Sequence, residues 1–465
     1  MKILMASSEA LPYFKSGGLA DVARSLPDAL RARGHDARII HPAYPGIPER
    51  IPLVEHERLI VPWVGGQIEL RTFTHDPGDA APAVLVHHHA FGTRGSPYED
   101  HDPAAPARRF ALFSRAVLWY AQKWGADVVH LNDWQTGLVP VYALTDGVHI
   151  PTVFAIHNLA YQGIFDRRIL DEIGVPREFF RPENGLEFHG NVAFIKGGIG
   201  LSDRVVTVSP TYAREIQTPE YGAGLEGLLR FRSRVLHGIL NGIDTHAWNP
   251  VTDHALYAHY THESLEGKAE NKSRLAGELN FNGDAPLCVV ISRLAHQKGI
   301  DLVVRALPGI LDAGANLVVL GDGDRALEAQ FTEIAHRFPR RVAAFLRFDD
   351  NLARKLYAAA DFLLMPSRYE PCGLGQMIAQ RYGTLPIVRA TGGLVDTVQD
   401  GKTGFMFADA TPHALYETVI RALGAYRQPG FRKLREKCMQ LDWSWGSSAT
   451  QYEDVYRYAI GPSAS

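Results

Sequence analysis

The sequence predicts an α/β protein made of two doubly wound domains, each with a parallel sheet, that face each other across a cleft. Its 465 residues exceed what one hydrophobic core ordinarily organises, so two domains are expected. In both halves, short apolar runs end in polar or glycine-rich loops and are followed by amphipathic stretches, which is the order of strand, loop and helix. A turn-rich segment, 240–250, separates the two series.

In the first half, the apolar run 2–8 leads through a Gly-Gly loop into a predicted helix over 19–33. Residues 51–95 alternate between apolar and polar and contain a glycine pair, which predicts a hairpin excursion. A helix over 110–124 then feeds the next strand. The further strands expected in this half are 37–40, 127–132, 152–156 and 204–208.

The turn-rich segment predicts an N-terminal domain over 1–240 and a C-terminal domain over 241–445. A final helix, 446–460, carries apolar and aromatic residues at helical spacing, and we expect it to pack back on the first domain. The strands expected in the second half are 287–291, 316–320, 342–346, 362–365 and 385–388.

The composition excludes several classes of function. A net charge of −3 carries no electrostatic footprint for nucleic acid or for an anionic membrane surface. No apolar stretch approaches the roughly 20 residues that span a bilayer. Three widely spaced cysteines form no disulfide framework and no metal-ligand pairing, which favours a reducing, cytoplasmic location.

Two loops of the second half carry the first functional signal, because open α/β sheets bind ligands at the carboxyl ends of their strands. Glu370 follows the strand at 362–365 and can accept hydrogen bonds from sugar hydroxyls. Gly392 and Gly393 follow the next strand and open a helix, so bare backbone N–H groups and the helix dipole can face an anion. Together they predict a ligand in which a sugar is attached to a phosphate. For Glu370 alone, the alternative is an acid favoured by a helix N-terminus.

Cations follow strands in both halves. Arg293 and Lys298 come after the strand at 287–291, where they can clamp a diphosphate and stabilise its departure; the alternative is a pair of surface salt bridges. Lys15 with Gly17 and Gly18 follows the first strand, and it is either a second phosphate cradle or an ordinary turn with a solvated lysine.

Polar and aromatic side chains end two neighbouring strands of the first half. His157 and Asn158 follow 152–156, and Asp133 and Trp134 follow the strand before it. An acid, an imidazole and an aromatic ring at one rim suit a sugar, although a lone histidine is more often structural.

Other features have simpler explanations. Tyr357 either stacks on a nucleobase or packs in the core, and Cys372 is a small buried residue rather than a nucleophile. The run Gly321-Asp322-Gly323-Asp324-Arg325-Ala326 matches a dinucleotide pattern but lacks the acid expected about 20 residues on, so we interpret it as a tight turn. The Asp-x-Asp at 322–324 lies on this turn, and no metal site is predicted.

Several segments, taken in order, resemble bacterial glycogen synthases and plant starch synthases. The likeness extends from about residue 1 to about residue 458. It rests on Lys15-Ser16-Gly17-Gly18-Leu19-Ala20-Asp21-Val22, His130-Leu131-Asn132-Asp133-Trp134-Gln135, His157-Asn158-Leu159-Ala160-Tyr161-Gln162-Gly163, Tyr221-Gly222-Ala223-Gly224, Asn241-Gly242-Ile243-Asp244, Arg293 with Lys298, Glu370-Pro371-Cys372-Gly373-Leu374 and Thr391-Gly392-Gly393-Leu394-Val395-Asp396-Thr397.

The resemblance implies a GT-B fold that closes over its cleft, with the donor nucleotide held mainly by the second domain. It also implies the transfer of glucose from ADP-glucose to the non-reducing 4-hydroxyl of an α-1,4-glucan such as glycogen, with retention and without a metal or other cofactor. A starch synthase or a UDP-glucose-using relative is the nearest alternative. A non-catalytic glucan-binding protein is an alternative from another class, which the intact Lys15, Arg293, Lys298 and Glu370 disfavour.

The resemblance further implies roles for matching positions. His157, Arg293, Lys298 and Glu370 would be catalytic. The donor would contact Lys15, Gly17, Gly18, Asp21, Asp133, Asn241, Tyr357, Cys372, Gly373, Leu374, Thr391, Gly392, Gly393, Leu394 and Thr397, and the acceptor side would comprise Tyr98, Trp134 and Asn158. No second carboxylate stands where a covalent nucleophile should be, so we expect a front-face reaction in which the departing diphosphate accepts the acceptor's proton.

Overall fold

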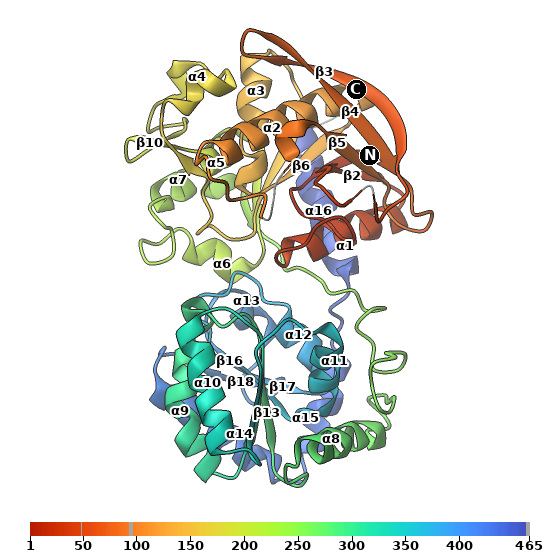
Figure 1. Cartoon of the computed structure of the whole chain (residues 1–465), viewed down its shortest axis with the longest axis vertical. Helices are drawn as coiled ribbons and strands as arrows, with labels where there is room; N and C mark the ends of the chain where they lie inside the picture. The colour runs from red at the N-terminus through yellow and green to blue at the C-terminus, as the bar shows by residue number, and fades with distance from the viewer. Residues whose placement is uncertain (48, 93–95, 462–465) are drawn as a thin grey trace. The chain divides into compact units, whose positions relative to one another are not determined.

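The computed structural model describes residues 1–47, 49–92 and 96–461, and it divides the chain into two α/β units (Figure 1). Unit 1 comprises Met1–Asn241 with the C-terminal segment from Trp445, and unit 2 comprises Gly242–Ser444. Each unit has its own sheet with helices packed along it. The predicted fold class, two α/β domains with parallel sheets, is confirmed.

The main sheet of unit 1 has the strand order β12-β11-β7-β6-β1-β2-β5-β4-β3. Its strands are parallel from β12 through to β5, and the hairpin β3–β4 continues the sheet in antiparallel fashion. This hairpin is the excursion predicted within 51–95. The strands are β1 (Lys2–Ala6), β2 (Asp36–Pro42), β3 (Val54–Trp63), β4 (Gly66–His75), β5 (Ala83–His87), β6 (Val128–Asn132), β7 (Thr152–Ile156), β11 (Arg204–Thr207) and β12 (Leu236–Gly238).

The helices of unit 1 follow the strands. Helix α2 begins at Ala105 rather than at 110, because Pro106 fits the first helical turn, where its missing N–H is not needed. A small antiparallel sheet, β8-β10-β9, lies apart from the main one. The remaining elements are α1 (Leu19–Ala32), α2 (Ala105–Trp124), α3 (Val139–Thr145), α4 (Ile169–Ile173), α5 (Phe194–Leu201), α6 (Pro210–Glu215), α7 (Glu226–Phe231), β8 (Ile164–Phe165), β9 (Glu187–Phe188) and β10 (Asn191–Ala193).

Helix α16 (Trp445–Ile460) ends the described chain and packs on unit 1. The hydroxyl of Tyr456 lies 2.9 Å from Nδ1 of His130, which is buried in β6. Glu453 of α16 pairs with Arg33 and His35 after α1, at 2.5 and 2.9 Å. These contacts explain the aromatic spacing of the C-terminal helix.

Unit 2 has a parallel sheet in the order β15-β14-β13-β16-β17-β18. Helices α9, α10 and α14 lie on one face, and α8, α11, α12 and α15 lie on the other (Figure 1). The strands are β13 (Leu287–Ile291), β14 (Asn316–Leu320), β15 (Val342–Phe345), β16 (Phe362–Met365), β17 (Leu385–Arg389) and β18 (Phe405–Phe407); the helices are α8 (Glu266–Leu279), α9 (Ile300–Asp312), α10 (Arg325–Arg337), α11 (Asp350–Ala359), α12 (Gly375–Arg381), α13 (Gly392–Thr397), α14 (Pro412–Tyr426) and α15 (Phe431–Met439).

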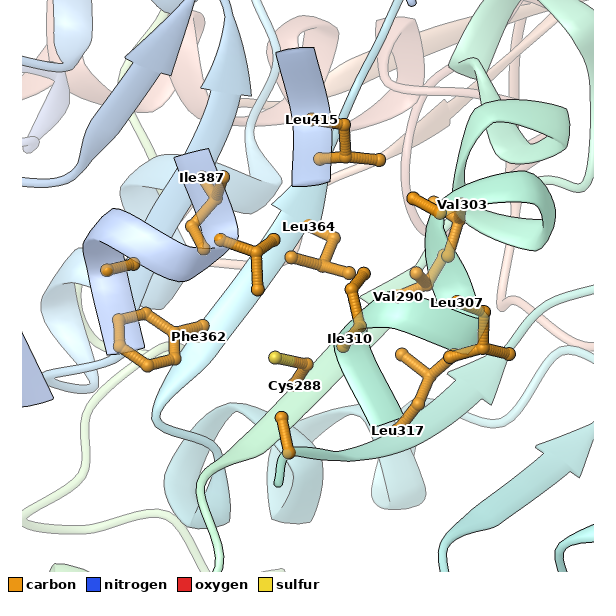
Figure 2. Close-up of a cluster of buried hydrophobic side chains, with 14 of the residues drawn as sticks. Cys288, Val290, Val303, Leu307, Ile310, Leu317, Phe362, Leu364, Ile387 and Leu415 are labelled. Atoms are coloured by element: carbon orange, nitrogen blue, oxygen red, sulfur yellow. The ribbon is translucent and has the colours of Figure 1, made fainter. Parts of the chain in front are cut away.

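The core of unit 2 forms where alternate strand residues meet the apolar face of α9. Val303, Leu307 and Ile310 recur at helical spacing along α9 and point toward Val290 and Leu364 of the sheet (Figure 2). All of these side chains are buried. This packing holds β13 and β16 side by side and so determines where the loops that follow them emerge.

Over the described ranges, no helix combines the length and apolar character that crossing a membrane requires. Within the same ranges, no three His, Cys, Asp or Glu side chains gather as a group suited to hold a metal ion.

Candidate active site

Lys298 and Glu370 form an ion pair at the carboxyl edge of the unit 2 sheet. Lys298 ends a short 3₁₀ helix, His296–Lys298, after β13, and Glu370 lies in the loop after β16, the strand that pairs with β13. The Lys298 Nζ lies 2.9 and 2.7 Å from the two Glu370 carboxylate oxygens, and Ser367 Oγ donates to the same carboxylate at 2.9 Å. Glu370 is buried. Two residues predicted to hold a diphosphate and a sugar therefore neutralise each other here.

The loops that carry this pair are tied together. Arg368 donates to both carboxylate oxygens of Asp301 at 2.7 and 2.8 Å and to the carbonyl of His296 at 2.8 Å. Gly299 has a φ of +65°, and a Cβ there would lie 2.0 Å from the Pro366 carbonyl oxygen. Only glycine permits this close approach, so the two loops that carry Lys298 and Glu370 are packed directly against each other.

Gly392 and Gly393 serve close packing as well as helix initiation. At Gly392, φ is +47°, and a Cβ would lie 1.9 Å from the Glu370 carbonyl oxygen; at Gly393 it would lie 2.3 Å from that of Cys372. The Gly393 N–H donates to the Glu370 carbonyl at 3.1 Å. The idea of bare N–H groups at both glycines therefore needs correction, because this N–H already has an acceptor.

Gln376 is a residue that sequence reasoning missed. It is fully buried on α12, and its Nε2 donates to the carbonyls of Cys372 and Gly373, both at 3.0 Å, and to Thr397 Oγ1 at 3.1 Å. Thr397 in turn donates to the Gly393 carbonyl at 2.6 Å. The buried amide of Gln376 therefore links the loop after β16 to helix α13, which follows β17. No local signal marks it, since a polar residue early in a helix is usually exposed.

The other predicted donor residues of unit 2 fall into different environments. Arg293 is exposed, and its side chain makes no hydrogen bond or ion pair within the described ranges. Leu394 is fully buried, and Leu374 immediately precedes α12. Tyr357 is 4% exposed, with its ring edge-on to Trp248 at 5.8 Å. The packing interpretation of Tyr357 therefore fits better than an open stacking platform.

Cys372 and Thr391 line the same loops. Cys372 is buried and free of any disulfide, and Thr391 immediately precedes α13 with its side chain buried. Neither side chain has the exposure of a nucleophile.

The segment 321–326 is a tight turn between β14 and α10. Gly321 and Gly323 have φ of +146° and +149°, and the Asp322 carbonyl accepts from the Leu294 N–H at 2.7 Å. Asp324 caps α10 by accepting from the Ala326 N–H at 2.8 Å. The Asp324 carboxylate therefore serves as a helix cap, and the segment forms the tight turn that the sequence predicts.

In unit 1, the loop after β1 folds around Glu9, a second residue that sequence reasoning missed. Its buried carboxylate accepts from the N–H groups of Ser16 and Gly17 at 2.7 and 3.0 Å, from Ser16 Oγ at 2.5 Å and from the Tyr98 hydroxyl at 2.7 Å. An internal carboxylate thus occupies part of the predicted phosphate cradle. Only the sequence Ser7-Ser8-Glu9 after a strand hinted at it.

The rest of this loop leads into α1. Gly18 occupies the N-cap position of α1 without a side-chain cap. Lys15 is partly exposed and pairs with Asp21 in the first turn at 2.9 Å. Lys15, Gly18 and Asp21, all three predicted on the donor side, therefore lie at the same helix start.

Asp133 combines a strained backbone with burial. Its φ and ψ are +55° and −175°, a region that residues other than glycine rarely adopt and that clusters at functional sites. The Asp133 carboxylate is buried and accepts from the His157 N–H at 2.8 Å. Burial raises the pKa of Asp133 to about 7, although hydrogen bonds from the His157 and Asn158 backbone oppose the shift.

His157 faces a third missed residue, Asn132. Asn132 donates through Nδ2 to the Ala6 carbonyl at 2.9 Å, which leaves its Oδ1 to accept from His157 Nε2 at 2.7 Å. Burial lowers the pKa of His157 to about 4, so the ring is neutral at physiological pH. The ring is therefore a fixed, uncharged group at the end of β7.

The predicted acceptor-side residues lie in one aromatic region of unit 1. Trp134 is buried and has its ring 6.4 Å from that of Tyr98. Asn158 is half-buried, and its Oδ1 accepts from the Ala160 N–H at 3.1 Å. Asn241, predicted on the donor side, is buried at the end of unit 1. Unit 1 thus presents aromatic rings, amides and a neutral imidazole near the carboxyl ends of β6 and β7.

Comparison with known proteins defines the class and then the family. The model for the starch synthase catalytic domain matches residues 2–231, and that for glycosyl transferases group 1 matches residues 271–440. Two such α/β units make the protein a glycosyltransferase of the GT-B class. The chain belongs to the glycogen synthase family, with which it shares similarity along nearly its whole length.

Two relatives and two solved structures illustrate this. Glycogen synthase from Anaeromyxobacter dehalogenans (strain 2CP-C) is 45% identical, covering 98% of this chain and 99% of the relative. Glycogen synthase 1 from Methylococcus capsulatus is also 45% identical, covering 99% and 97%. The catalytic domain of starch synthase IV from Arabidopsis thaliana, bound to ADP and acarbose, superposes with a TM-score of 0.89 at 34% identity, covering 98% and 99%. Sucrose-phosphate synthase from Thermosynechococcus elongatus, at 20% identity, covers 98% of each chain with a TM-score of 0.64 and shares the fold.

Proposed function

We propose that the protein is a retaining glucosyltransferase that moves glucose from ADP-glucose to the non-reducing 4-hydroxyl of an α-1,4-glucan and so elongates glycogen. The observation that carries the proposal is the ion pair between the partly buried Lys298 and the buried Glu370 at adjacent strand ends, with the exposed Arg293 in the same loop as Lys298. A cation for phosphate and a carboxylate for hydroxyls at one edge suit a nucleotide sugar. The starch synthase that superposes on this chain was solved with ADP.

In the proposed reaction, Lys298 and Arg293 stabilise the diphosphate as the bond to the glucose C1 breaks. We also assign Lys15 to donor binding, as the resemblance implies. A diphosphate oxygen accepts the proton of the attacking acceptor hydroxyl, which bonds to C1 on the face that the leaving group vacates. Trapping a glucosyl-protein adduct from the wild-type enzyme would refute this route.

The residues of unit 1 suit the developing positive charge at C1. A neutral His157 ring does not repel that charge, whereas an imidazolium ion would. We assign Asp133 to the donor glucose and Tyr98, Trp134 and Asn158 to the acceptor. No metal or other cofactor takes part in the proposed route.

One assay tests the proposal. Radiolabelled ADP-glucose and UDP-glucose are each supplied with glycogen primer, with and without a chelator. We expect incorporation from ADP-glucose that the chelator leaves unchanged. Preference for UDP-glucose would indicate the other donor class, loss of activity with chelator would indicate a metal, and primer binding without incorporation would indicate a non-catalytic glucan-binding protein.

A cytoplasmic location is also proposed. Its support is that Cys288, Cys372 and Cys438 are all free and buried, as suits a reducing compartment. Detection of the protein outside the cytoplasmic fraction would contradict it.

A further inference from the structure

Arg109 is a buried arginine to which the proposed reaction gives no role. It lies in α2 with only 2% of its surface exposed. Its Nε donates to the Ala90 carbonyl at 3.0 Å, one terminal nitrogen donates to the Pro97 carbonyl at 2.6 Å, and the other donates to the Asp100 carboxylate at 3.0 Å. All three partners lie in the connection between β5 and α2. One planar guanidinium thus holds both ends of that connection.

The clamped connection carries Tyr98. The Tyr98 ring stacks on Phe110, the residue next to Arg109, with centroids 5.9 Å apart and planes inclined by 26°. The Tyr98 hydroxyl lies 2.7 Å from a Glu9 carboxylate oxygen and 3.1 Å from Ser8 Oγ. Pro97 and Asp100 lie on either side of this tyrosine in the chain, so Arg109 holds the backbone carbonyl just before it and a side-chain carboxylate two residues after it.

We propose that Arg109 is a positioning residue for glucan binding, which sets Tyr98 in its place on the acceptor side. The inference rests on the proposed function, because Tyr98 is assigned there to the acceptor. Ordering a loop costs conformational entropy, and a planar guanidinium that already holds the residues on either side of Tyr98 lowers that cost at the binding step. The hydrogen bond from Arg109 holds the pKa of Asp100 below its ordinary value.

Lysine in place of Arg109 is the informative change. It keeps the positive charge, but its single ammonium on a flexible stem lacks the planar fork that reaches three acceptors. Arg115 provides a matched control, because it is another buried arginine of α2 and pairs with Asp146, away from Tyr98. A loss that both Arg109→Lys and Arg115→Lys show would be a general effect of disturbing α2.

The primary measurement is the binding of a maltooligosaccharide by calorimetry, supported by the KM values for glucan and ADP-glucose. We expect Arg109→Lys to raise the glucan Kd and KM by about tenfold, the scale of one lost charged hydrogen bond, with the ADP-glucose KM within about twofold. Arg115→Lys should leave the glucan Kd unchanged. Asp100→Asn, at the partly exposed end of the clamp, should raise it by about threefold without unfolding the protein.

A double-mutant cycle separates positioning from bulk stability. In a Tyr98→Ala background, Arg109→Lys should change the glucan Kd by less than about twofold, because the residue to be positioned is gone. An undiminished effect in that background, or an unchanged glucan Kd in Arg109→Lys with a normal Tm, would overturn the inference. If the wild-type protein binds glucan but transfers no glucose, the proposed function fails while the binding data still decide the role of Arg109.

Discussion

Replacing Lys298 with alanine separates the structural cost of the Lys298–Glu370 pair from its chemical role. The Lys298 side chain is 19% exposed and that of Glu370 is 6% exposed. Breaking a buried pair costs about 3–5 kcal/mol, and the partial exposure of Lys298 lowers our expectation to about 2–3 kcal/mol. At roughly 2–4 °C per kcal/mol for a unit of this size, Tm should fall by about 4–12 °C. The free energy of unfolding from denaturant titration checks this value.

The loss of kcat in Lys298→Ala should be larger than its loss of stability explains. If Lys298 donates to the departing diphosphate, its loss lowers kcat by roughly 10²-fold or more at temperatures where the variant is fully folded. Lys272→Ala is the control within unit 2, because it removes a partly buried lysine that pairs with Asp361 at 2.8 Å. Arg435 also pairs with Asp361, so that variant should lose less stability than Lys298→Ala and should keep its kcat. An unchanged kcat in Lys298→Ala, or equal rate losses in the two variants, would refute the diphosphate role.

Three further outcomes are expected. Because the pKa of Asp133 is raised to about 7, the folded protein keeps a proton on this carboxyl that the unfolded chain has lost, and the free energy of unfolding falls as pH rises from about 4 to 7. Asp133→Asn should remove this decline and raise the free energy of unfolding by up to about 4 kcal/mol at pH 8, as denaturant titrations at pH 5 and 8 will measure. Gly392→Ala should destabilise by more than about 2 kcal/mol through its clash with Glu370, whereas Gly401→Ala, with φ of +69° and open space, should cost only about 1 kcal/mol; equal losses in thermal melts would disprove the clash. Glu370→Gln should bind ADP about tenfold more tightly, because Lys298 is released, yet bind ADP-glucose no better than ADP by calorimetry.

Much of the fold could be predicted from the sequence because residues that pack in the core recur at the spacing of a strand or a helix. Each buried strand of unit 2 is a short apolar run, and α9 carries its apolar residues at helical spacing. The start of α2 was harder to predict, because Ala105 and Pro106 by themselves are typical of a loop. The side chain of Arg109 can be buried only because three acceptors in the preceding connection bind its guanidinium, and the spacing of residues in the sequence does not reveal these acceptors.

The candidate site could be predicted only in part, because residue types indicate chemistry but not partners. Lys298 and Glu370 each follow a strand, yet their contact depends on the crossover that pairs β13 with β16. Gly392 suits both an exposed N–H and a close approach, and the local pattern does not distinguish them. Glu9 gave only the weak signal of following a strand, because its donors lie in a loop whose path only the structure defines.

In each unit, donors that were predicted to bind an anion contact a carboxylate of the same unit. Glu9 occupies the Ser16 and Gly17 N–H groups in unit 1, and Glu370 occupies Lys298 in unit 2. This arrangement gives these partly buried donors acceptors within the protein. We infer that a diphosphate which takes Lys298 also frees the Glu370 oxygens for the hydroxyls of the attached sugar. One exchange of partners then favours a nucleotide carrying glucose over the bare nucleotide, which is the difference that Glu370→Gln is expected to abolish.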